Sequence, residues 1–186
     1  VRLCLDTGVA GLSIEDSTGD PAAPLRPLEA ALERLAAARA AIDASGTGAV
    51  LTARAECHLV GHPDPQRESL RRLEAYAAAG ADCLYAPGLR TPEAVGAVVK
   101  AVAPRPVNVL ASGPFFTARQ LEDLGVRRIS VGGALARAAW GGFMRAAEEI
   151  AVHGTFGALG QAPPHARLDA LFREDARERR GGGAAP

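Results

Sequence analysis

The chain has 186 residues, with 21 Lys and Arg against 21 Asp and Glu. Its length fits one ordinary domain, and its balanced charge argues against nucleic acid or an anionic membrane as a partner. Lys100 interrupts the most apolar stretch, VGAVVKAVA, so the sequence predicts no membrane-spanning helix. Three cysteines, Cys4, Cys57 and Cys83, lack the spacing of a disulfide framework, which favours a reducing, cytoplasmic location.

Helix and strand patterns alternate along the chain. The first segment, VRLCLDTG, is typical of the end of a helix, so we expect a further segment upstream. The clearest helix runs from Pro27 to Ala44, where apolar residues recur at helical spacing. Thr91 and Thr117 precede two further helices in the N-cap position. Five short apolar runs predict strands: GVAGLSIED, GAVLTARAE, ADCLYAPG, RPVNVLASG and RRISVGG.

This alternation predicts a parallel sheet with helices packed against it. A β/α barrel and a doubly wound sheet both fit the pattern. No Gly-x-Gly-x-x-Gly follows a strand, which weakens the dinucleotide-binding version of the second fold. Polar residues end the strands, as expected where a barrel enzyme builds its site. We therefore expect a barrel, although only five of its eight strands are readable.

Four of these segments, in this order, resemble the isocitrate lyase/phosphoenolpyruvate mutase superfamily: GVAGLSIED, LTARAE, RRLEAYAAAGADCLYAPG and RRISVGGALARAAW. The likeness is greatest to its phosphoenolpyruvate mutase-like branch, often labelled carboxyvinyl-carboxyphosphonate phosphorylmutase. It implies a modified (β/α)8 TIM barrel, of which residues 1–172 form strands four to eight. The charged and then glycine-rich residues 173–186 predict a disordered tail.

The resemblance also implies an activity and a cofactor. Members are Mg²⁺-dependent enzymes of lyase, mutase or hydrolase type that act on small 2-oxo carboxylates or phosphonates. A C–C or P–C bond breaks or forms through an enolate-like intermediate. The family further implies homo-dimers or homo-tetramers that exchange a C-terminal helix. The family's first three strands, which carry most aspartates around the metal, have no counterpart in this sequence. The alternative is therefore an incomplete barrel that acts as a structural or interaction module.

Glu15 is the candidate metal residue. It matches the glutamate that ends the family's fourth strand and holds Mg²⁺, usually through water. Mg²⁺ prefers hard oxygen ligands and retains several waters, which suits a single carboxylate at this place. For the neighbouring Asp16 two interpretations stay open, a role at the site or ordinary turn chemistry.

Arg54 is the candidate catalytic and substrate-binding residue, because it matches the family arginine that binds the substrate carboxylate or phosphonate. A guanidinium offers a planar fork of donors and keeps its charge. The alternative is a structural ion pair with Glu56. Glu56 could orient Arg54 or contact the substrate, and Asn108 could bind a substrate oxygen or be a satisfied polar group inside the barrel.

Two departures from the family pattern narrow the expected reaction. The lyase branches carry a Lys-x-Cys-Gly-His motif where this chain has STGDPAAPLRP, so we do not expect isocitrate or methylisocitrate cleavage. Pro87 stands where the true mutase has a histidine, which argues against that activity as well. The loop from Ser17 to Pro27 is expected to act as a lid. Gly132 and Gly133 form either a phosphate-binding turn or simply a tight one.

Overall fold

The computed structural model describes residues 1–181. The chain divides into two compact units, unit 1 from Val1 to Ala134 and unit 2 from Leu135 onward. Among the described residues, no helix is long and apolar enough to cross a membrane.

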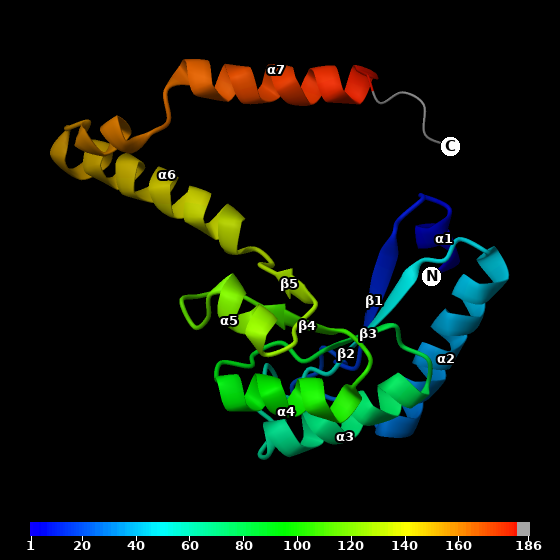
Figure 1. The fold of residues 1–186 in the computed structure, drawn as a ribbon. Coiled ribbons are helices and arrows are strands. Elements are labelled where there is room, and N and C mark those ends of the chain that lie inside the picture. The colour runs from blue at the N-terminus through cyan, green and yellow to red at the C-terminus, as the bar shows by residue number, and fades with distance from the viewer. Residues whose placement is uncertain (182–186) are drawn as a thin grey trace. The chain divides into compact units, whose positions relative to one another are not determined.

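Unit 1 is built on a five-stranded sheet in the order β1-β2-β3-β4-β5. All neighbouring strands run parallel, which confirms the predicted parallel sheet. The strands are β1 (Gly11–Glu15), β2 (Val50–Arg54), β3 (Cys83–Tyr85), β4 (Val107–Leu110) and β5 (Arg128–Ser130). The helices are α1 (Arg2–Leu5), α2 (Leu28–Ser45), α3 (Pro65–Ala78), α4 (Pro92–Val102) and α5 (Ala118–Asp123). Figure 1 shows α2 to α5 arranged along one face of the sheet.

The helices of unit 1 begin where the sequence offers a cap. Thr91 accepts a hydrogen bond from the Ala94 N–H ahead of α4, and Pro92 occupies the first helical turn. Thr117 and Gln120 form a reciprocal capping box at the start of α5. The long α2 ends at Gly46, whose φ of 65° is a left-handed conformation that glycine adopts readily.

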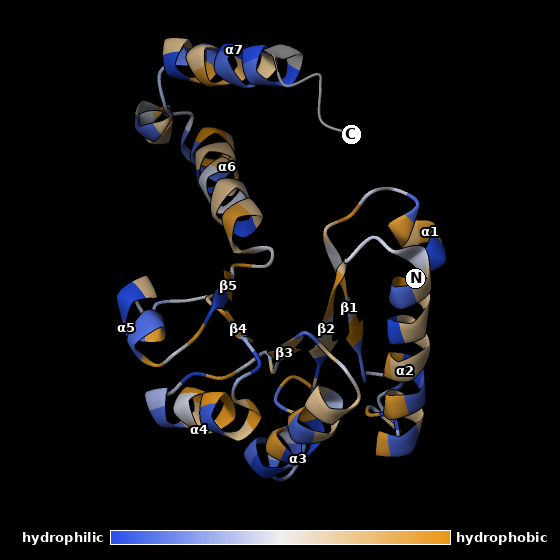
Figure 2. Ribbon diagram, turned by 45° about the vertical axis from the view of Figure 1, so that its right-hand side comes forward, coloured by the Kyte–Doolittle hydropathy of each residue, from blue (hydrophilic) through white to orange (hydrophobic). Residues whose placement is uncertain are grey.

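The core of unit 1 lies between the sheet and these helices. Alternate strand residues, such as Leu51 and Ala53 on β2, are fully buried against them. The remaining core consists of apolar residues from the helices and the other strands, among them Leu35, Leu73, Leu84, Val95, Val98, Val107 and Val109. Each such Leu or Val contributes about 1.5–3 kcal/mol of burial free energy. Figure 2 shows hydrophobic segments along the strands and mixed character on the surrounding helices.

The opposite face of the sheet carries polar side chains. Thr52 and Arg54 alternate with the buried Leu51 and Ala53, as the two-residue period of a strand requires. The Arg128 guanidinium reaches across from β5 and donates to the Thr52 hydroxyl at 3.0 Å. A hollow of about 400 Å³ lies here, lined by Ala10, Gly11, Leu12, Ser13, Val50, Thr52 and Arg128.

Unit 2 contains α6 (Ala134–His153), the short 3-10 helix η1 (Gly157–Gln161) and α7 (His165–Gly181). The Glu149 carboxylate accepts hydrogen bonds from the N–H groups of Gly157 and Ala158 at 2.8 and 2.6 Å, which ties η1 to α6. No residue of α6 is buried. Its exposed large apolar side chains include Trp140 and Phe143, whose rings pack edge to face at 5.4 Å.

The sequence predicted a disordered tail over residues 173–186. In the structure α7 continues to Gly181, so this helix contains residues 173–181. Ion pairs at helical spacing support it, Arg173 with Asp169 at 3.3 Å and Arg179 with Asp175 at 2.9 Å. Residues 182–186 lie outside the described part of the chain.

Candidate active site

A row of side chains crosses the sheet from the last residues of β1, β2 and β3 to the second residue of β4. Glu15 of β1 is in register with Arg54 of β2, Arg54 with Tyr85 of β3, and Tyr85 with Asn108 of β4. Partners in a parallel register lie on the same face, so these side chains line one surface. The structure thus places the predicted residues Glu15 and Arg54 at one edge of the sheet, with Asn108 further along the same face. This edge is where barrel enzymes assemble their sites.

Arg54 is the centre of this row. Its Nε donates to Glu56 Oε1, its Nη2 lies 3.2 Å from Glu56 Oε2, and its Nη1 lies 3.3 Å from Glu15 Oε2. The guanidinium also sits over the Tyr85 ring, 5.4 Å from its centroid. Glu56 therefore occupies the side-on fork formed by Nε and Nη2. The terminal pair, Nη1 and Nη2, retains N–H groups that can bind an anion.

Glu56 holds Arg54 from a buried position, since only 5% of its side chain is exposed. Burial raises the pKa of Glu56, while the hydrogen bond and charge of Arg54 act in the opposite direction. The sequence left two roles open for Glu56, to orient Arg54 or to contact the substrate. The structure contains the contact needed for the first, because the Glu56 carboxylate accepts hydrogen bonds from the Arg54 guanidinium. Contact between Glu56 and a substrate stays a prediction.

Asn108 is buried on β4, and its side chain is only partly satisfied. Its Nδ2 donates to the Ser130 hydroxyl at 3.0 Å, whereas its Oδ1 has no hydrogen-bond partner among the described residues. A buried carbonyl oxygen without a partner is unusual and is suited to accept a hydrogen bond from water or a ligand. The binding of a substrate by Asn108 stays a prediction.

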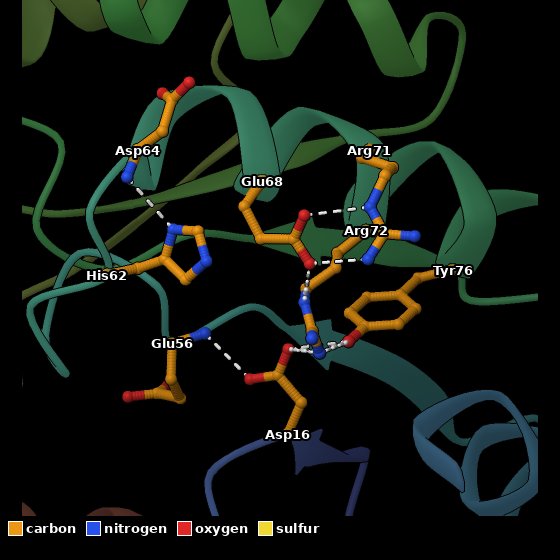
Figure 3. A network of polar contacts seen from close by, with 8 residues as sticks. All are labelled: Asp16, Glu56, His62, Asp64, Glu68, Arg71, Arg72 and Tyr76. Atoms are coloured by element: carbon orange, nitrogen blue, oxygen red, sulfur yellow. Dashed lines mark hydrogen bonds and ion pairs between the residues drawn. The ribbon is translucent and has the colours of Figure 1, made fainter. Parts of the chain in front are cut away.

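Asp16 follows Glu15 but lies on the other side of the sheet. Its side chain is 1% exposed and faces α3 (Figure 3). Asp16 Oδ2 accepts from Arg72 Nη1 at 2.9 Å and from the Tyr76 hydroxyl at 2.6 Å, and Oδ1 accepts from the Glu56 N–H at 2.9 Å. Burial and the Asp16 carboxylate raise the pKa of Tyr76 well above its ordinary value, so its hydroxyl stays protonated and donates.

The α3 side of this network was missed from the sequence. Arg72 also donates from Nε to Glu68 Oε1 at 2.7 Å, so its guanidinium bridges two carboxylates. Glu68, Arg72 and Tyr76 are spaced by four residues and therefore form one stripe on the helix. A polar stripe on the face that packs against a sheet is the signal that could have revealed it.

The loop from Ser17 to Pro27 has internal structure. Ser17 and Leu25 form an antiparallel bridge, and the Thr18 hydroxyl donates to the Ala23 carbonyl at 2.6 Å. At the base, the Arg26 N–H donates to the Asp16 carbonyl at 2.8 Å. The segment is thus a small hairpin, and its predicted action as a lid would require movement as one piece.

Comparison with known proteins identifies the family. Residues 1–151 match the phosphoenolpyruvate phosphomutase family. The chain belongs to this family. The resemblance predicted from the sequence motifs is therefore confirmed. No curated protein matches the chain significantly.

Solved structures of phosphoenolpyruvate phosphomutase relatives agree with this assignment. A provisionally named lyase/mutase from Burkholderia cenocepacia J2315 is 44% identical over 92% of this chain and 62% of its own, with a TM-score of 0.87. A provisionally named phosphonomutase from the same organism is 33% identical over 80% of this chain and 60% of its own, with a TM-score of 0.71. The chain thus spans less than two thirds of either relative.

A third relative was solved with ligands. It is a phosphonopyruvate hydrolase in complex with oxalate and Mg²⁺, 26% identical over 96% of this chain and 63% of its own, with a TM-score of 0.75. The structural relatives are TIM-barrel proteins of the phosphoenolpyruvate mutase/isocitrate lyase superfamily, which confirms the predicted fold class. Their names are those of mutases, lyases and hydrolases, so this is a family of enzymes.

The residues described here fit one part of a phosphomutase-type Mg²⁺ site. Glu15 presents a half-exposed carboxylate at the site edge, and one of its oxygens faces Arg54. Within residues 1–181, no three His, Cys, Asp or Glu side chains are grouped to hold a metal. Mg²⁺ is commonly held by one or two carboxylates and several waters, so Glu15 suits one direct or water-mediated position.

Proposed function

We propose that the protein is a Mg²⁺-dependent enzyme of lyase, mutase or hydrolase type that acts on a small 2-oxo carboxylate or phosphonate. The observation that carries this proposal is the arrangement of Arg54. Its side-on fork is held by Glu56, Glu15 lies 3.3 Å from Nη1 at the same edge, and each terminal nitrogen has a second N–H for an anion. A fixed cation next to a carboxylate suits a substrate that bridges an arginine and a metal ion.

Each residue would have a distinct task. Mg²⁺, when bound, withdraws negative charge as an enolate-like species develops. Glu15 would hold the ion from the β1 end, and Arg54 would bind the carboxylate or phosphonate group through its terminal fork. Glu56 would keep the guanidinium in its plane, and Asn108 Oδ1 would accept a hydrogen bond from a water or from a hydroxyl of the substrate. The oxalate and Mg²⁺ in the hydrolase relative support a 2-oxo carboxylate as the ligand class.

The loop composition narrows the reaction. The segment from Ser17 to Pro27 contains no Cys, Lys or His. It therefore lacks the acid–base groups of the lyase motif, and isocitrate or methylisocitrate cleavage is not proposed. Pro87 at the position of the mutase histidine argues against phosphoenolpyruvate mutase activity. A hydrolase or lyase reaction on another small 2-oxo acid fits best.

The test uses the full-length protein, assayed with Mg²⁺ against oxaloacetate and phosphonopyruvate. We expect turnover of one of them. Arg54→Ala should lower kcat/KM by about a hundredfold, since a bidentate charged contact is lost, and Glu15→Ala should raise the Mg²⁺ concentration needed for half activity. Undiminished turnover in both variants would refute the role assignment.

We also propose that subunits assemble as homo-dimers or homo-tetramers with an exchanged C-terminal helix. The support is the exposure of apolar residues in unit 2, where Trp140 and Phe143 are each 62% exposed. Large apolar side chains gathered on a surface mark protein interfaces more often than free surface. A cytoplasmic location is proposed as well, because Cys4, Cys57 and Cys83 are all free thiols.

The alternative function is a non-catalytic structural or interaction module. It is favoured by the lack, in the part of the chain that the structure describes, of three grouped His, Cys, Asp or Glu side chains that could hold a metal. The two functions differ in one measurement, the binding of Mg²⁺ and oxalate followed by calorimetry. Binding of both with substrate turnover identifies the enzyme, whereas a folded protein that binds neither identifies the module.

A further inference from the structure

Asp16 is connected to the candidate active site through the backbone of the Arg54–Glu56 segment. Its N–H donates to the Arg54 carbonyl at 3.2 Å, and its Oδ1 accepts from the Glu56 N–H at 2.9 Å. These two bonds hold the segment on both sides of Ala55. The Ala55 N–H in turn donates to the Tyr85 carbonyl at 2.8 Å. The backbone that carries both clamp residues is thus fixed from β1 and from β3.

The other oxygen of Asp16 is anchored to α3. Arg72 Nη1 and the Tyr76 hydroxyl both donate to Oδ2 (Figure 3), and Arg72 is itself held by Glu68. The Arg72 side chain is 6% exposed, so this ion pair is shielded from solvent. Although burial disfavours the charge of Arg72, its contacts with Tyr76, Glu68 and Asp16 raise its pKa. The Asp16 carboxylate is therefore anchored on α3 through one oxygen while its other oxygen holds the Glu56 backbone.

We infer that Asp16 is a positioning residue of the active site, which fixes the Arg54–Glu56 clamp to α3 through its buried carboxylate. It does not contact the ligand itself. Its two oxygens accept from three donors, two on α3 and one on the Glu56 backbone. Its side chain lies on the face of the sheet opposite to that of Glu15. This inference rests on the proposed function, because the clamp is assigned there as the anion site.

The two interpretations that the sequence left open for Asp16 are separated by this geometry. A metal ligand would have to present a free oxygen toward Glu15, and Asp16 presents none. A simple turn residue would bond only to its own loop. Asp16 does accept the Arg26 N–H at the loop base, but with its backbone carbonyl. Its side chain instead contacts residues that are distant in the sequence: Glu56, Arg72 and Tyr76.

Two single-atom substitutions separate the two sides of the carboxylate. In Asp16→Asn the amide has one oxygen, and two donors from α3 compete for it against one from Glu56. The oxygen should therefore face α3, and the amide NH₂ should meet the Glu56 N–H and break that anchor. Tyr76→Phe removes one bond on the α3 side and leaves the Glu56 anchor intact. It is the matched control.

The decisive measurement is the affinity for oxalate with saturating Mg²⁺, in the full-length protein, alongside the Tm of each variant. Both variants should lower the Tm. Only Asp16→Asn should weaken oxalate binding, by about tenfold, the effect of losing one charge-assisted contact that preorganises the clamp. Unchanged oxalate affinity in Asp16→Asn overturns the inference. Equal weakening in both variants also overturns it, because it would reflect general destabilisation.

Hydrogen exchange of the 54–56 backbone, without ligand, distinguishes this inference from the proposed function. Faster exchange there in Asp16→Asn than in Tyr76→Phe supports anchoring by Asp16, and equal exchange contradicts it. If the unmodified protein binds no oxalate, the proposed function fails and with it the role of Asp16 in anion binding. The exchange comparison then still decides whether Asp16 fixes the segment.

Discussion

At the scale of single residues, one guanidinium is shared by two carboxylates. Arg72 contacts Asp16 on one side and Glu68 on the other, and Arg71 also bonds to Glu68. Removing one member of a buried ion network leaves the others without compensation, which costs more than the network contributes as a whole. The surroundings of Glu68 therefore influence stability as a function of pH.

Glu68 should make the free energy of unfolding depend on pH in the acid range. Hydrogen bonds from Arg71, opposed by partial burial and aided by Arg72, lower its pKa to about 2. A carboxyl whose pKa is lower in the folded state stabilises the fold above its unfolded pKa, and this contribution disappears as the pH falls through the folded value. Glu68→Gln should therefore cost about 2 kcal/mol of unfolding free energy at pH 7.

The measurement is urea unfolding from pH 7 down to about pH 2, with Glu74→Gln on the same helix as control. The difference between Glu68→Gln and the unmodified protein should shrink steadily below the ordinary Glu pKa. The exposed Glu74 should show a much smaller effect at every pH. A Glu68→Gln difference that does not change with pH would contradict the assignment.

Lysine should not be able to replace Arg54. Arg54→Lys keeps a positive charge but loses the fork, so it cannot hold Glu56 and an anion at once. We expect kcat/KM to fall by at least about tenfold, mainly through KM, since in the proposed function the lost contact binds the substrate. Steady-state kinetics with the preferred 2-oxo acid check this, with the exposed Arg105→Lys as control. A Lys variant with full activity would mean that charge alone suffices.

At the scale of elements, the turn after β3 has a strict steric requirement. Gly88 has a φ of 98°, and a Cβ built there would lie 2.8 Å from His58 Cβ. The loops that follow β2 and β3 are thus in direct contact. Gly61 also has a positive φ, of 70°, but a Cβ there would meet nothing within 4 Å. Gly61 therefore tests the cost of a positive φ alone, and Gly88 tests the cost of a positive φ together with a steric clash.

Gly88→Ala should destabilise the protein by about 3 kcal/mol, because left-handed strain and a steric clash add. Gly61→Ala should cost only about 1 kcal/mol, from strain alone. Chemical denaturation of both variants measures the difference. Equal losses would show that the contact between the loops adapts to the extra methyl group.

At the scale of the whole molecule, the exposed apolar side of α6 is the feature that a single chain does not explain. Phe143→Glu places a charge in this surface and should shift the proposed homo-dimers or homo-tetramers to monomers, because burying a carboxylate in an apolar interface is strongly unfavourable. Light scattering coupled to size-exclusion chromatography measures the mass. Glu148→Lys on the same helix is the control and should keep the assembly. An unchanged mass for Phe143→Glu would place the interface elsewhere.

Much of the fold was predictable because it depends on local pattern. The five strands, the helix from Pro27 and the caps at Thr91 and Thr117 follow from periodicity and turn chemistry. The neighbourhood of Glu15 and Arg54 followed from strand ends that meet at one edge, whereas Asn108 is the second residue of β4. The role of Asp16 did not, because its partners Arg72 and Tyr76 lie on a helix more than fifty positions away. The spacing of Glu68, Arg72 and Tyr76 shows that they share one face of the helix, but which strand residue they meet is fixed by packing.

Glu15 and Asp16 are adjacent, yet one carboxylate serves the open face and the other the buried side. One inserted or deleted residue within β1 would exchange them, because strand side chains alternate between faces. The longer Glu side chain would then have to fit beside Arg72 on the buried side, and Asp would lie on the face of Arg54. The length of β1 should therefore not vary among homologues. The hairpin after it closes on itself through Ser17 and Leu25, so we expect its length to vary among homologues without disturbing either carboxylate.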